Sequence, residues 1–160
     1  MKELTFDSRR FLSGQTKPLS VGVFGSRSLK DERVKMVILE KLIELNATKV
    51  VTAQEPQGVC EVAQRICKDY GYPLQLHFLN MKYLRGCFEQ RSKEIIHASD
   101  FIIIIHDGKS KGTANEKILA DKLKIPYHYE IIEPSQYERS VGFNIMKEWG
   151  DGKDESTEWQ

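Results

Sequence analysis

Five consecutive apolar residues, 101–105, constrain the fold of this chain more than any other feature of its sequence. The run Phe-Ile-Ile-Ile-Ile lacks the alternation of apolar and polar side chains that a half-buried strand shows. Its short length and β-branched composition favour a strand that is apolar on both faces. Such strands lie in the middle of parallel sheets that helices cover on both sides, so we predict residues 101–105 as the central strand.

Four more apolar runs alternate with amphipathic segments, and we predict them as strands at 19–24, 49–52, 74–78 and 127–132. Repeated β-α units with right-handed crossovers predict an α/β fold, a three-layer, doubly wound, Rossmann-like parallel sheet of about five strands in the order 3-2-1-4-5. The intervening segments repeat apolar residues at helical spacing. Their apolar positions are Val34, Ile38, Leu42 and Leu45; Val59, Val62, Ala63, Ile66 and Tyr70; Phe88, Ile95 and Ile96; and Ile118, Leu119 and Leu123.

A length of 160 residues fits one domain, and the chain contains no internal repeat or domain linker. We divide it into an N-terminal extension at 1–17, a Rossmann-like domain at 18–133, a segment at 134–149, and a charged tail at 150–160 that we expect to be disordered. The 134–149 segment is predicted to pack as a last helix or to form a homodimer or higher homo-oligomer. Its apolar residues are Tyr137, Val141, Phe143, Ile145, Met146 and Trp149.

Charge and cysteine content exclude several classes of function. Lys and Arg total 24 against 23 Asp and Glu, and no basic run indicates a nucleic-acid partner. A charged N-terminus and the lack of a long apolar window predict a cytoplasmic protein without membrane contact. Cys60, Cys67 and Cys87 have neither C-x-x-C spacing nor a His cluster, so we predict no disulfide framework, metal or cofactor. Cys60 and Cys67 are predicted as buried positions on one helix.

The first predicted strand leads into the loop Gly25-Ser26-Arg27-Ser28. Parallel strands all end at one edge of the sheet, so the loops that follow them form the ligand crevice. Gly25 would let backbone N–H groups approach an anion, Ser26 would add a hydroxyl, and Arg27 would clamp a phosphate or carboxylate through two hydrogen bonds. A plain β-α turn explains these residues equally well.

The run of residues 106–116 follows the strand at 101–105 and leads into a helix. Two glycines, two lysines and two hydroxyl residues meet a helix N-terminus, whose free N–H groups and dipole favour a negative group. Thr113 and Glu116 also fit a capping box, in which Glu116 reaches back to the Thr113 N–H, and this is their alternative role. The residues of this run that we predict to bind a ligand are Gly108, Lys109, Ser110, Gly112, Thr113 and Glu116.

Two common nucleotide motifs are absent. Gly112 is followed by Thr113, so the run is not a Walker A motif, and Gly22-Val23-Phe24-Gly25 is not a G-x-G-x-x-G fingerprint. ATP hydrolysis and ordinary NAD-dependent dehydrogenation therefore lose their main sequence support. The predicted topology brings Arg85 or Arg91, at the start of the third helix, toward the same edge. A solvated helical arginine is the alternative.

Four motifs together resemble the SLOG superfamily over residues 19–132: Val23-Phe24-Gly25-Ser26-Arg27, Gln57-Gly58-Val59-Cys60, Gln90-Arg91-Ser92 and Gly108 to Glu116. That superfamily joins LOG-type phosphoribohydrolases and DNA-processing protein A with small standalone nucleotide-sensing domains, which this chain resembles most. By this resemblance Arg91 and Glu116 match the pair that carries hydrolysis of the N-glycosidic bond in LOG-type enzymes. Gly112, Thr113 and Glu116 match the end of the P-G-G-x-G-T-x-x-E motif.

Two departures from the family pattern weaken the prediction of catalysis more than the prediction of binding. Residues 107–111 replace the proline and paired glycines, and Cys60 stands where small standalone relatives commonly carry Asp. We therefore expect a binding domain that senses or sequesters a nucleotide or nucleotide-derived phosphorylated ligand. A phosphoribohydrolase acting on a nucleoside 5′-monophosphate is one alternative, and a protein-interaction module with a vestigial pocket is another.

Overall fold

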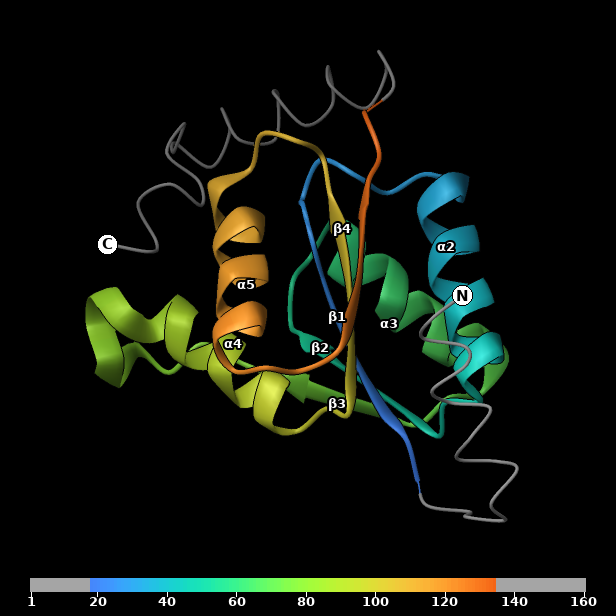
Figure 1. The fold of residues 1–160 in the computed structure, drawn as a ribbon, viewed down its shortest axis with the longest axis horizontal. Coiled ribbons are helices and arrows are strands. Elements are labelled where there is room, and N and C mark those ends of the chain that lie inside the picture. The colour runs from blue at the N-terminus through green and yellow to red at the C-terminus, as the bar shows by residue number, and fades with distance from the viewer. Residues whose placement is uncertain (1–17, 135–160) are drawn as a thin grey trace.

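The computed structural model describes residues 18–134, which form a three-layer α/β fold with a parallel sheet as the middle layer (Figure 1). The strands lie in the order β3-β2-β1-β4-β5, and every neighbouring pair is parallel. Both the α/β class and the strand order predicted from the sequence are confirmed. The strands are β1 (Ser20–Gly25), β2 (Lys49–Ala53), β3 (Leu74–His77), β4 (Phe101–His106) and β5 (Tyr127–Ile131).

Two pairs of helices cover the two faces of the sheet (Figure 1). Helices α2 (Glu32–Leu45) and α3 (Val59–Tyr70) lie on one face, and α4 (Cys87–His97) and α5 (Lys111–Lys122) lie on the other. A 3₁₀ segment, η1 (Met81–Gly86), precedes α4. Because the strands are parallel, the loops after β1, β2 and β4 lie at one edge of the sheet, where they contact one another and α4.

Strand β4 is buried along its whole length, as its uninterrupted apolar run predicts. Phe101, Ile103 and Ile105 pack in the core under α2 and α3, whereas Ile102 and Ile104 pack under α4 and α5. The central strand, however, is β1, because two strands lie on each side of it, β3 and β2 on one and β4 and β5 on the other. Strand β4 is an interior strand, second from the edge of the sheet. An apolar run on both faces shows that helices cover both sides of a strand, and this is true of both β1 and β4, so it does not identify the central strand.

The predicted apolar stripe of α2 is confirmed, but that of α5 is wrong in phase. Ile118 is 60% exposed and Leu123 is 36% exposed, and only Leu119 of the predicted stripe is buried. Gly112, Thr113 and Ala120 are buried with Leu119, so the face of α5 nearest the sheet repeats at 112, 113, 116, 119 and 120. This phase turns Glu116 inward. On α3, Tyr70 is also more exposed than predicted, at 51%.

The three cysteines are buried and free, which confirms the interior positions predicted for Cys60 and Cys67. Burial raises the pKa of the Cys60 thiol to about 12 and that of Cys67 to about 11. Residues 18–134 contain no cluster of three side chains suited to a metal ion. In the same range, no helix combines the length and apolar character that crossing a membrane requires. The predicted extension, oligomerisation segment and tail lie outside the described residues, apart from residue 134.

Candidate functional site

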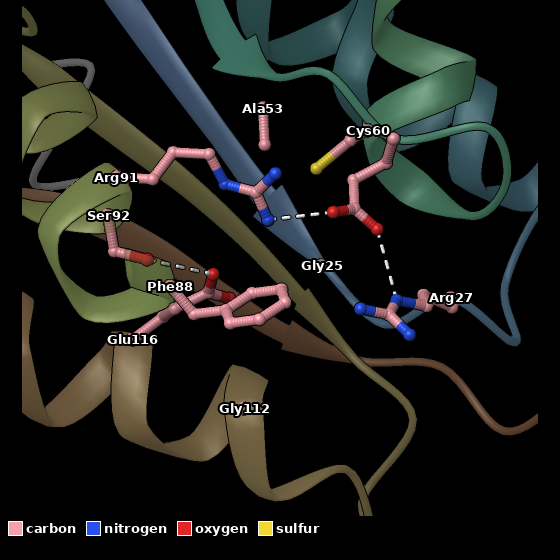
Figure 2. A pocket seen from close by; sticks show the side chains of 10 residues that line it. Gly25, Arg27, Ala53, Cys60, Phe88, Arg91, Ser92, Gly112 and Glu116 are labelled. Carbon is pink, nitrogen blue, oxygen red and sulfur yellow. Dashed lines mark hydrogen bonds and ion pairs between the residues drawn. The ribbon is translucent and has the colours of Figure 1, made fainter. Parts of the chain in front are cut away.

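A pocket opens at the carboxyl edge of the sheet, between the ends of β1 and β2 and the helices α4 and α5 (Figure 2). Half of its lining consists of residues predicted from the sequence to bind a ligand: Gly25, Arg27, Arg91, Gly112 and Glu116. The remaining lining residues are Ala53, Glu55, Cys60, Phe88 and Ser92. The structure thus brings segments from four loops and helices to one place.

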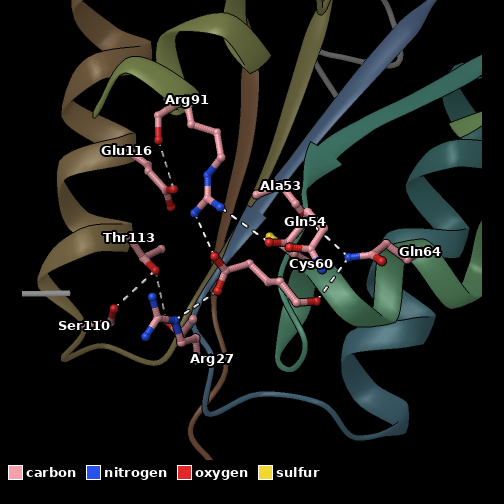
Figure 3. A network of polar contacts seen from close by, with 12 residues as sticks. Arg27, Ala53, Gln54, Cys60, Gln64, Arg91, Ser110, Thr113 and Glu116 are labelled. Atoms are coloured by element: carbon pink, nitrogen blue, oxygen red, sulfur yellow. Dashed lines mark hydrogen bonds and ion pairs between the residues drawn. The ribbon is translucent and has the colours of Figure 1, made fainter. Parts of the chain in front are cut away.

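Two arginines in the pocket share one carboxylate (Figures 2 and 3). Arg27 Nε donates to Glu55 Oε1 at 3.0 Å, and Arg91 Nη2 donates to Glu55 Oε2 at 2.7 Å. The side chains of Arg27, Glu55 and Arg91 are only 16%, 12% and 9% exposed. Charge-assisted bonds between groups this buried are less screened than surface pairs, so the three side chains form a fixed unit.

Arg91 is held by contacts on three sides. Its guanidinium carbon lies 5.4 Å from the centre of the Phe88 ring, three residues earlier on α4. Its Nη1 atom donates to the backbone oxygen of Gln54 at 3.4 Å, in addition to the bond with Glu55. With a residue exposure of 8%, Arg91 is not the solvated helical arginine that spacing alone favours. Arg85 is the exposed one of the two, and it does not line the pocket.

Glu55 lines the pocket but is not among the residues predicted from the sequence. It lies in the β2–α3 loop, where Gln64 Nε2 of α3 donates to the backbone oxygens of Ala53 and Glu55, both at 3.2 Å (Figure 3). The loops after β1 and β4 are recognisable by glycine and hydroxyl residues, which this loop lacks before Gly58. Its position after a strand of a parallel sheet is the signal that could have found Glu55, because every such loop ends at the same edge.

Gly25 is required by packing against α3. A Cβ atom on this residue would lie within 3.0 Å of all three side-chain carbons of Val59. The neighbouring N–H of Ser26 donates to the backbone oxygen of Ile105, and the Val59 N–H donates to the backbone oxygen of Ser26. These N–H groups therefore serve the fold, and Arg27 supplies the first loop's donor to the pocket.

Ser26 and Thr113 join the two predicted binding loops behind the pocket. The hydroxyl of Ser26 is fully buried, accepts the Asp107 N–H at 3.1 Å and lies 3.2 Å from the hydroxyl of Thr113. The Ser110 hydroxyl lies 3.4 Å from that of Thr113 (Figure 3). None of these three predicted ligand-binding residues lines the pocket. In the structure, Ser26, Ser110 and Thr113 contact one another and connect the two loops.

The loop before α5 carries its own anion, the carboxylate of Asp107. Its Oδ1 atom accepts the N–H groups of Lys109 and Ser110, both at 2.8 Å, and its Oδ2 atom accepts the Ser28 hydroxyl at 2.8 Å. Burial alone would raise the pKa of Asp107, but these hydrogen bonds lower it below the ordinary value of 3.8. Gly108 and Lys109, two residues of the predicted phosphate loop, are exposed and do not line the pocket.

Replacing Asp107 with asparagine should cost about 1 kcal/mol of unfolding free energy at neutral pH, because charged acceptors form the stronger hydrogen bonds. A lowered folded-state pKa means that this contribution is present above pH 3.8 and is lost as pH falls through the folded-state value. Urea titrations should therefore show the gap between wild type and Asp107→Asn closing on acidification. Glu40→Gln, at an exposed acid on α2, is the control; a gap that widens toward low pH contradicts the assignment.

The capping box, the alternative role of Thr113 and Glu116, does not form. Helix α5 begins at Lys111 with Ser110 as its N-cap, and no side chain caps it. Thr113 therefore lies inside the first turn, and Glu116 lies on the inward face, where it accepts the Ser92 hydroxyl at 3.4 Å. The helix starts three residues earlier than the box requires, after a loop in which Asp107 accepts the N–H groups of Lys109 and Ser110. Glu116 is thereby a pocket residue (Figure 2).

No family model matches the chain, and neither the curated proteins nor the solved structures give a significant match. The resemblance to the SLOG superfamily therefore stays a prediction from motifs.

Proposed function

We propose that this protein binds a nucleotide or nucleotide-derived phosphorylated ligand in the pocket at the carboxyl edge of the sheet, as a sensor or sequestering domain. The observation that carries the proposal is the lining of the pocket. It combines two arginines, two glutamates and one aromatic ring, from Arg27, Arg91, Glu55, Glu116 and Phe88. Ligands of open parallel sheets bind at this edge, where the strand order reverses between β1 and β4.

The balance of charge in the lining favours a ligand with two kinds of polar group. Guanidinium forks match phosphate oxygens through paired hydrogen bonds, which suits Arg27 and Arg91. Carboxylates accept hydrogen bonds from hydroxyl groups, which suits Glu116 to a sugar. A phosphorylated nucleoside carries both groups, whereas inorganic phosphate or a free nucleoside would use only half of the site. Phe88 adds apolar surface for a base.

The position of Glu116 in the pocket supports the alternative function, a phosphoribohydrolase. Its carboxylate lies in the pocket with Arg91 and Ser92, the residues that the resemblance aligns with a catalytic arginine motif. A carboxylate at this position could stabilise a positively charged ribose or activate water. The interaction-module alternative depends on residues 134–149, which lie almost wholly outside the described part of the chain.

Nucleoside 5′-monophosphates should raise the melting temperature far more than the matching nucleosides, because only the phosphate can use both arginines. At 100 times its dissociation constant a ligand adds about 2.7 kcal/mol to the free energy of unfolding. For a domain of this size the shift is roughly 2–4 °C per kcal/mol. Thermal unfolding with four ribonucleoside 5′-monophosphates, each paired with its nucleoside, measures the difference.

The same plate should include inorganic phosphate as a control for nonspecific anion effects. Equal shifts with phosphate and with every monophosphate would mean that the sugar and base contribute nothing. A screen in which no phosphorylated compound moves the transition would contradict the proposed function.

A further inference from the structure

We infer that Glu55 holds the anion position of the pocket in the free protein and that the ligand's phosphate displaces it from Arg27 and Arg91. The inference rests on the proposed function and adds to it a residue that sets affinity and specificity. Its basis is the placement of one carboxylate between two guanidinium groups that come from different elements (Figure 3).

The two arginines converge on Glu55 as they would on a phosphate. Arg27 approaches from the β1–α2 loop and Arg91 from α4, and each donates to a different oxygen of the same carboxylate. Carboxylate and phosphate present similarly spaced oxygens to a guanidinium fork. A phosphate in this pocket would bind the same guanidinium nitrogens of Arg27 and Arg91 that the Glu55 carboxylate occupies. The two anions therefore compete for one position.

The arginine on α4 would stay in place after Glu55 leaves. The stacking of Arg91 on Phe88 and its bond to the Gln54 backbone oxygen do not involve the Glu55 side chain. The freed Nη2 donor is therefore already oriented for an incoming anion, and little reorganisation opposes binding.

Glu55 can be exchanged without moving its loop. Gln64 binds the backbone oxygens on both sides of Gln54, and this clamp fixes the chain at Ala53 and Glu55. Rotation of one side chain is then enough to withdraw the carboxylate from the pocket. Competition with an internal carboxylate weakens binding of every anion, so ligands with a doubly charged phosphate and further contacts are favoured over simple monoanions.

The test is Glu55→Gln, which keeps the shape of the side chain and removes its charge. Calorimetry with inorganic phosphate and with the four ribonucleoside 5′-monophosphates should give binding at least about tenfold tighter in the variant, because the competing anion is gone. Glu61→Gln on α3 is the matched control, since Glu61 pairs with Arg65 outside the pocket. Its affinities should equal those of the wild type.

The outcomes separate this inference from the proposed function. If the wild type binds monophosphates and Glu55→Gln binds them equally or more weakly, the inference is wrong and the function stands. If only Glu55→Gln binds inorganic phosphate and neither protein binds monophosphates, the inference stands and the function is wrong. Binding of no probe by either protein overturns both.

A second variant guards against loss of folding in Glu55→Gln, which leaves the cations Arg27 and Arg91 without their shared anionic partner. Glu55→Asp retains the charge but shortens the side chain, so that it can no longer reach both arginines. We expect phosphate affinity between those of the wild type and Glu55→Gln. An affinity at or below the wild-type value, in a variant that melts cooperatively, would overturn the inference.

Discussion

Gly25→Ala should destabilise the domain by about 3 kcal/mol, near the upper end of what overpacking costs. The added methyl would lie within 3.0 Å of Cβ, Cγ1 and Cγ2 of Val59. Val59 is fully buried and opens α3, so it cannot move aside without shifting that helix from the sheet. Because Gly25 and α3 also border the pocket, the shift should loosen the site together with the fold.

Urea unfolding of Gly25→Ala against Gly86→Ala measures this cost under matched conditions. At Gly86 a Cβ atom would meet no heavy atom within 4 Å, and its φ of −89° is open to alanine. We expect the control to unfold within about 0.5 kcal/mol of the wild type, as substitutions at unconstrained surface sites do. A Gly25→Ala variant as stable as Gly86→Ala would mean that Val59 of α3 does not pack closely against Gly25 of β1.

The fold follows from the sequence because its signals are periodic and mutually consistent. A buried strand flanked by helices on both sides has to be apolar on both faces, and residues 101–105 are. Val34, Ile38, Leu42 and Leu45 repeat at the spacing of one helix face, and all four are fully buried. The right-handed crossover rule then leaves few strand orders, and the observed order is the one predicted.

The site is harder to predict because the spacing of residues along the chain does not reveal which side chains from different loops pair with one another. Arg91 and Glu55 are 36 positions apart in the chain, and no periodic pattern links them. The loop 107–110 has the composition of an anion site, but Asp107 accepts its N–H groups from Lys109 and Ser110. Composition reveals that donors are present, and only three-dimensional structure reveals which of them are already used.

Glu116 illustrates how one helix boundary changes the meaning of a residue. With α5 starting after Thr113, Glu116 would cap the helix and have no place in a pocket. With the observed start at Lys111, the residue lies on the inward face beside Ser92. Helix ends are set by capping and loop contacts, which sequence periodicity does not encode.

Arg91→Ala should weaken the binding of nucleoside 5′-monophosphates about hundredfold, since it removes charged hydrogen bonds worth roughly 1.5–3 kcal/mol each. The fold should survive, because Glu55 keeps its bond to Arg27 and is not left as an unpaired buried charge. Calorimetry gives the affinity, and thermal unfolding without ligand confirms that the variant is folded. Affinity within about threefold of the wild type would remove Arg91 from the phosphate site.

Glu116→Gln is the matched variant, because it changes the facing carboxylate and leaves both arginines in place. If the protein only binds its ligand, the substitution removes one charged acceptor for a sugar hydroxyl, and affinity should fall by about tenfold, less than in Arg91→Ala. Wild-type protein incubated with nucleoside monophosphates should then release no free base in a chromatographic assay. Base release by the wild type that disappears in Glu116→Gln, with monophosphate binding retained, would instead assign Glu116 to bond cleavage. Ground-state binding and transition-state chemistry are distinguished by this pair, since loss of a phosphate clamp lowers affinity while loss of a catalytic carboxylate lowers turnover alone.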